Sequence, residues 1–292
     1  SEVIIDAGGN ILVASSTQSS GAESSGGFPI RNSAIQTTFG GGRQDGVILK
    51  FSPNLNAVLF STYFGGSADD ACFVLSQNPL TGNIYVAGGT NSSNLPGDKT
   101  GVLQGTYAGG QVDGFVTQIL NDGSAIVKTT YQGTVGNDLV YGIQFDKAGF
   151  PYIMGTTSGN WTVVNAVFSN PGSKQFISKM QPDLSAYVYS TVFGTNTGNA
   201  GPPNLSPTAF LVDRCQNVYV SGWGGGINAL RGYPTAGTLG MPEVGQLSGL
   251  PAADGSDFYF FVLEKNAQSQ LFGSHFGHNG GNIGEHVDGG TS

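Results

Sequence analysis

The sequence predicts an all-β fold built of repeated four-stranded antiparallel sheets, the arrangement found in the blades of a β-propeller. Three observations support this prediction. One glycine-rich motif recurs at a fixed offset, a second motif recurs four times, and the 292 residues include 48 glycines but only 10% charged residues. Such a composition fits neither a disordered chain nor a helical one.

The first motif is QTTFGGGRQDG at Gln36–Gly46, which returns 68 residues later as QGTYAGGQVDG. The same offset relates Asp45 to Asp113 and Tyr63 to Tyr131. Two tracts that share one offset are a poor match to chance. The chain therefore contains an internal repeat.

The second motif is a turn followed by an apolar strand, and its equivalent positions are Ser15, Gly88, Gly155 and Gly222, spaced by 73, 67 and 67 residues. Four copies are therefore visible. We expect one β-propeller segment over residues 1–292, with blades near 3–66, 70–133, 140–194 and 209–277 and the start of a fifth at 285–292. Four copies and a further start favour part of a larger ring over a closed ring of four.

Each copy contains four short runs of β-branched and aromatic residues between Gly, Asn, Asp and Ser turn signals, without a helical period. In the last three copies the predicted strands are 72–77, 83–88, 114–120 and 125–131; 140–145, 152–156, 175–180 and 187–193; and 209–212, 218–222, 258–265 and 270–276. The connections from second to third strands are long enough to be loops with their own role: 16–44, 89–112, 157–174 and 223–256. Because one sheet cannot bury both of its faces, we expect the sheets to stack face to face in a ring rather than form a solenoid.

The net charge of −8 and the pI near 4.6 predict a surface that repels nucleic acid and anionic lipid headgroups. No run of 18 apolar residues occurs, so we expect no membrane span in this segment. The ends fall within the repeat pattern, which favours a segment of a longer polypeptide. Cys72 and Cys215 lie two copies apart, so a mutual disulfide is not expected, whereas a bond from Cys215 to a cysteine outside the segment stays open.

The phrases GNIYVAGGT and LKFSPNLNAVLFSTYFGGSADD resemble the SBBP (seven-bladed β-propeller) repeats, most closely those of large surface proteins of Bacteroidetes. The resemblance covers nearly the whole chain. It implies a ring of about seven blades within a secreted or cell-surface protein that carries a gliding motility-associated sorting domain and uses type 9 secretion. The third copy departs from the pattern because it lacks the aspartate near Lys174, and the fourth carries an insertion from Gly224 to Gly255.

No motif indicates catalysis. Neither Gly-x-Ser-x-Gly nor His-Glu-x-x-His occurs, and the three histidines lie within the last 18 residues, at His275, His278 and His286, with no spacing typical of a zinc site. We therefore expect no enzyme activity, no catalytic residue and no cofactor.

Two sets of aspartates have a structural and a metal-binding interpretation. Asp45, Asp113 and Asp257 recur just before third strands, where an aspartate organises a turn by accepting backbone N–H bonds. Asp69 and Asp70 offer oxygen ligands of the kind that calcium binds, but they lack the spacing of an EF-hand loop. We favour the structural interpretation and keep calcium near Asp69 and Asp70 as the alternative.

The candidate ligand-binding residues are the loop aromatics Trp161, Trp223 and Tyr233, whose rings could stack on sugars or anchor a partner. The competing interpretation is that they fill grooves between blades.

The sequence thus favours a non-enzymatic structural and interaction module of a secreted or surface protein, acting in adhesion or gliding motility. Its partners would be other domains of the same polypeptide, surface proteins or polysaccharide. The alternative is a glycan-binding, lectin-like propeller or a propeller enzyme, acting at the loop face or central channel with calcium.

Overall fold

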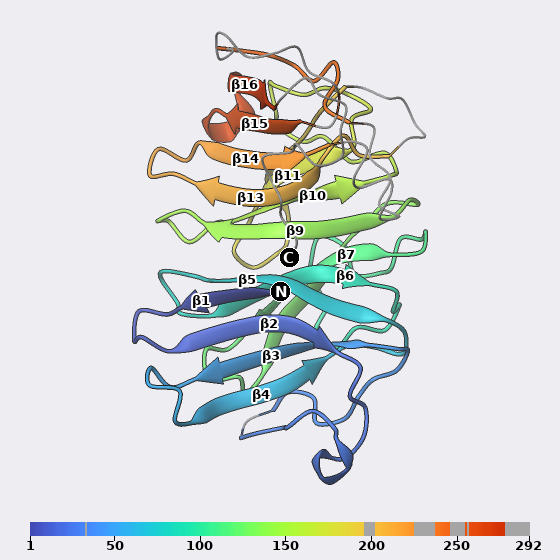
Figure 1. Ribbon diagram of the computed structural model, residues 1–292, viewed down its shortest axis with the longest axis vertical. Helices are drawn as coiled ribbons and strands as arrows, with labels where there is room; N and C mark the ends of the chain where they lie inside the picture. The colour runs from blue at the N-terminus through green and yellow to red at the C-terminus, as the bar shows by residue number, and fades with distance from the viewer. Residues whose placement is uncertain (33, 196–201, 225–236, 246–254, 256, 278–292) are drawn as a thin grey trace. The chain divides into compact units, whose positions relative to one another are not determined.

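The chain is an all-β protein, as the sequence predicts. The computed structural model describes residues 1–32, 34–195, 202–224, 237–245, 255 and 257–277, and this part of the chain forms sixteen strands in four antiparallel sheets of four strands each (Figure 1). Neighbours in every sheet are consecutive in the chain, so each sheet is a simple meander.

The first sheet contains β1 (Glu2–Ile5), β2 (Ile11–Thr17), β3 (Asp45–Phe51) and β4 (Val58–Phe64), and the second contains β5 (Asp70–Gln77), β6 (Ile84–Thr90), β7 (Asp113–Ile119) and β8 (Ile126–Gln132). The third contains β9 (Asp138–Phe145), β10 (Pro151–Thr157), β11 (Gln175–Met180) and β12 (Tyr187–Phe193), and the fourth contains β13 (Ser206–Val212), β14 (Val218–Trp223), β15 (Phe258–Leu263) and β16 (Gln270–Phe276).

Two strand boundaries in the fourth sheet differ from the prediction. The third strand ends at Leu263, two residues early, because Lys265–Ala267 forms a 3-10 turn in which Asn266 has a φ of 55°. The first strand begins at Ser206, earlier than expected, and contains a bulge between Pro207 and Ala209. Both differences arise from local backbone irregularities that apolar periodicity does not report.

The structure divides into two compact units, Ser1–Ile153 with Met180–Tyr187, and Met154–Lys179 with Val188–Ser292. Each unit is described by itself. No helix within the described residues is long and apolar enough to cross a membrane.

In the first unit, apolar side chains of the first and second sheets form one buried core. We call the side of each sheet that faces the next sheet along the chain its forward face, and the opposite side its backward face. The forward face of the first sheet contributes Ile48 and Phe64, and the backward face of the second contributes Val86 and Phe115. The rings of Phe64 and Phe115 lie 5.1 Å apart between centroids, so the two sheets are in direct contact.

We expect Phe115→Ala to lower the free energy of unfolding by about 3–5 kcal/mol, because the ring is fully buried between two sheets. Ile5→Ala is the control, since 72% of Ile5 is exposed, and should change stability by less than about 0.5 kcal/mol. Chemical denaturation followed by tryptophan fluorescence measures both. Equal effects of the two substitutions would contradict the assignment of this core.

Candidate functional sites

The recurring glutamine-led motif ties the long connection of a sheet to the fourth strand of the same sheet. The backbone N–H of Gln36 donates to Thr62 Oγ1 at 2.9 Å, and the N–H of Gly65 donates to Gln36 Oε1 at 3.0 Å. The residues 68 positions later repeat both bonds at 3.0 and 3.1 Å: Gln104, Thr130 and Gly133. The repeat visible in the sequence is thus a repeated structural contact.

The end of the same connection also bonds to the first strand of the next sheet. The backbone N–H of Asp70 donates to the carbonyl of Gln44 at 2.9 Å, and the N–H of Asp138 donates to that of Val112 at 2.8 Å. Each connection therefore contacts two sheets, which limits its freedom to reorganise around a ligand.

Asp45 and Asp113 begin the third strands β3 and β7, and each accepts a backbone N–H from its own connection. Gly40 donates to Asp45 Oδ2 at 2.5 Å, and Ala108 donates to Asp113 Oδ2 at 2.6 Å. This is the arrangement that the turn interpretation predicts. Asp257 is also buried, immediately before β15.

The chemical environment of Asp45 and Asp113 is unusual. Burial raises the pKa of Asp45 to about 6, with a further contribution from the charge of Asp70, and raises the pKa of Asp113 to about 7, with a further contribution from Asp138. In each of the two carboxyls, Oδ1 is buried and has no hydrogen-bond partner within the described structure. The motif thus places two carboxyls that resist ionisation at neutral pH.

Asp69 and Asp70, the candidate calcium ligands, are bonded to protein donors. Asp69 Oδ2 accepts from Arg43 Nε and Nη2 at 2.9 and 2.8 Å, and hydrogen bonds from Arg43 lower the pKa of Asp69. Asp70 accepts from the N–H of Gly66 at 2.7 Å, from Ser92 Oγ at 2.8 Å and from the hydroxyl of Thr90. Within the described residues, no three His, Cys, Asp or Glu side chains are grouped so that they could hold a metal ion.

The third copy replaces the aspartate, as the sequence predicts, and the replacing residue is Gln175 at the start of β11. Its partner is Asn204, which precedes β13. The N–H of Asn204 donates to Gln175 Oε1 at 2.5 Å, and Gln175 Nε2 lies 3.3 Å from Asn204 Oδ1. The sequence analysis missed this amide pair, although Gln175 stands first in its predicted strand as Asp45 and Asp113 do.

The loop aromatics are packed against the protein. The ring of Trp161 stacks on that of Phe176 with centroids 3.6 Å apart and planes 4° apart, and its Nε1–H donates to Ser190 Oγ at 2.9 Å. Trp223 ends β14 and is buried. Tyr233 lies outside the described residues. One face of Trp161 is therefore already used by an internal stack, which disfavours a role as a sugar platform.

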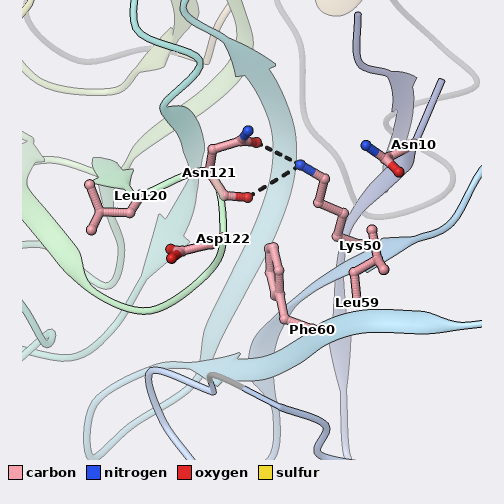
Figure 2. Close-up of a pocket in the computed structure, with 7 residues that line it drawn as sticks. All are labelled: Asn10, Lys50, Leu59, Phe60, Leu120, Asn121 and Asp122. Carbon is pink, nitrogen blue, oxygen red and sulfur yellow. Dashed lines mark hydrogen bonds between the residues drawn. The ribbon is translucent and has the colours of Figure 1, made fainter. Parts of the chain in front are cut away.

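A pocket of about 620 Å³ lies beside the first and second sheets, at the turn between β7 and β8 (Figure 2). Its charged centre is Lys50, whose Nζ donates to Asn121 Oδ1 at 2.6 Å and to the Asn121 carbonyl at 3.2 Å, and lies 3.0 Å from Asp6 Oδ2. The sequence carried no motif for this pocket. Because Lys50 is buried and paired, its amine links the two sheets rather than serving as a free nucleophile.

The cysteines and the described histidine also have structural surroundings. Both cysteines are free, Cys72 being buried, where burial raises its thiol pKa, and Cys215 being exposed. Nδ1 of His275 lies 2.5 Å from Glu243 Oε1. His278 and His286 fall outside the described residues.

Comparison with known proteins adds no assignment, since neither a protein-family model nor a curated protein matches the chain. The resemblance to SBBP repeats therefore stays a prediction. The fold defines an all-β protein of four repeated meander sheets.

We expect Trp161→Ala to lower the free energy of unfolding by about 3 kcal/mol, because it removes a stacked ring and an indole hydrogen bond. Trp161→Phe keeps a ring and should cost about 1–2 kcal/mol less than the alanine variant. Thermal and chemical denaturation measure both. The glycan-binding alternative requires the opposite result, namely unchanged stability together with lost binding on a glycan array.

Proposed function

We propose that the four sheets are successive blades of a β-propeller with further blades, and that this propeller is a non-enzymatic structural and interaction module of a secreted or cell-surface protein. The proposal rests on how sheets cover one another in the first unit and on which sheet faces are open.

The supporting observation is a packing step that repeats in one direction. The forward face of the first sheet packs against the second sheet, and the forward face of the second packs against β9. On that second forward face the ring of Tyr85 meets Phe145 of β9 with centroids 4.8 Å apart. Repetition of one step between four-stranded meanders is the geometry of propeller blades.

The forward face of the fourth sheet has the same apolar character but is open. Gly222 corresponds to Gly88 in the repeat, so Tyr219 corresponds to the buried Tyr85. Tyr219 is 38% exposed and its neighbour in β15 on the same face, Phe260, is 39% exposed. These rings border an apolar hollow of about 500 Å³.

The backward face of the first sheet is open in the same way, since Val3 is 61% exposed and Ile5 is 72% exposed. In the second sheet the backward face is covered by the first sheet. Apolar faces of this size are normally covered, so the two open faces favour additional blades. We propose that these blades belong to the same longer polypeptide.

The polar side chains favour a structural role over catalysis. The motif residues Gln36 and Asp70 and the pocket residue Lys50 bond to protein groups rather than converging on a shared open space. The module would then act as a rigid spacer whose long connections present a contact surface. Its role in adhesion or gliding motility, its export and its polysaccharide or protein partners rest on the resemblance to SBBP repeats.

The test is to purify the native polypeptide that contains this segment, measure its intact mass, and substitute Phe260→Ser in it and in the isolated segment. We expect a mass far above 30.0 kDa. The substitution should lower the melting temperature of the native polypeptide by several degrees, because its ring is covered there, and leave that of the isolated segment nearly unchanged.

Phe261→Ser is the matched control, because this neighbour is buried within the fourth sheet and should destabilise both proteins. A native chain that ends near Ser292, or a Phe260→Ser effect that is equally small in both proteins, would contradict the proposal of further blades.

A further inference from the structure

We propose that Asp45 with Asp70, and Asp113 with Asp138, each hold one shared proton where successive sheets meet, so that rising pH weakens the contact between these sheets. The proposal concerns the first unit and does not depend on the number of blades.

The first pair joins the third strand of one sheet to the first strand of the next. Asp45 begins β3 and Asp70 begins β5, and both are buried. A Cβ placed on Gly65 would lie 2.6 Å from Asp45 Oδ1 and 2.9 Å from Asp70 Oδ2. The two oxygens therefore border one small space that exists because residue 65 is glycine.

The second pair repeats this arrangement 68 residues later. Asp113 begins β7 and Asp138 begins β9, and both are fully buried. The side chain of Asp113 occupies the place that a Cβ on Gly133 would take, as Asp45 does at Gly65. Repetition of two carboxyls and one glycine argues for a designed contact rather than an isolated accident of packing.

The hydrogen bonds assign the proton within the first pair. Asp70 accepts from three donors, on Gly66, Thr90 and Ser92, which stabilise its ionised form. Asp45 accepts at Oδ2 from Gly40, and its Oδ1 has no partner within the described structure. A proton on Asp45 Oδ1 supplies the donor that this oxygen lacks and points it toward the space shared with Asp70.

The second unit contains a neutral counterpart at the equivalent place. Gln175 stands where Asp45 and Asp113 stand, and Asn204 accepts the N–H of Thr195 at 3.1 Å as Asp70 accepts that of Gly66. Here Gln175 Nε2 donates to Asn204 Oδ1 at 3.3 Å. An amide hydrogen thus occupies the position that we assign to the shared proton.

The surrounding groups do not neutralise a second negative charge. Around the first pair, Arg43 is paired with Asp69, and the Cys72 thiol has a raised pKa because it is buried, so it stays neutral. Around the second pair, burial also raises the pKa values of the Tyr107 and Tyr131 hydroxyls, which stay neutral near pH 7. Two ionised carboxylates at such a site would repel each other in a medium of low dielectric constant.

The direction of the pH effect follows from the raised pKa values. An aspartate ionises near pH 4 in the unfolded chain, whereas Asp45 and Asp113 hold their protons to about pH 6 and about pH 7 in the folded one. Their contribution to stability is therefore complete below about pH 4 and is lost as pH rises through about 6 to 7.

The experiment compares Asp45→Asn, Asp113→Asn and the double variant with the unaltered protein in urea denaturation from about pH 5 to about pH 8. Asparagine keeps an acceptor for Gly40 or Ala108 and supplies an N–H in place of the shared proton. We expect the unfolding equilibrium constant of the unaltered protein to rise by on the order of a hundredfold more than that of the double variant over this range. Asp122→Asn, at an exposed hairpin position, should follow the unaltered protein.

A double variant with the same pH dependence as the unaltered protein would overturn the proposal. Carbon-13 NMR of aspartate-labelled, unaltered protein provides a second readout that does not require a folded variant. Two carboxyl signals with midpoints near 6 and 7 are expected, and titration of every aspartate below about pH 5 would overturn the assignment. Stabilisation by calcium at about pH 8 that Asp45→Asn and Asp113→Asn abolish would also overturn it, because the pairs would then bind a cation.

Discussion

The structure depends on the contact between apolar faces of successive sheets. The second sheet shows why, because Val86 and Phe115 are buried on its backward face while Tyr85 and Val116 are buried on its forward face. A sheet that is apolar on both sides is unstable in water by itself and requires a neighbour on each side. The same requirement makes the open rings of the first and fourth sheets the most informative part of the surface.

Polar groups are admitted to these contacts only where each has a defined partner. Gln36 closes the end of its connection, and Lys50 bridges to Asn121 of the next sheet. The carboxyls of Asp45 and Asp113 are the exception, because one oxygen of each is buried without a partner. Since an unpaired buried polar atom is costly, a proton that supplies the missing bond is the least disruptive solution.

Strand content and strand order followed from sequence patterns that act over a few residues. Alternation in β7 and the turn at Asn121 and Asp122 predict the hairpin that the structure contains. The prediction failed at Lys265, where a left-handed residue, Asn266, breaks the strand although the side chains remain suitable for a strand. The stack of Trp161 on Phe176 could not be predicted either, because it depends on how a loop folds over a later strand.

By itself the sequence determined the all-β class, the repeat and the aspartates at the starts of third strands, since these depend on side-chain period and turn chemistry within short segments. Only the tertiary structure decided that Asp45 faces Asp70 and that Gln175 faces Asn204. Each of these pairs joins different sheets, and its geometry is set by face-to-face packing. No pattern along one strand carries that information, because the burial that changes the chemistry of these carboxyls exists only after two sheets have met.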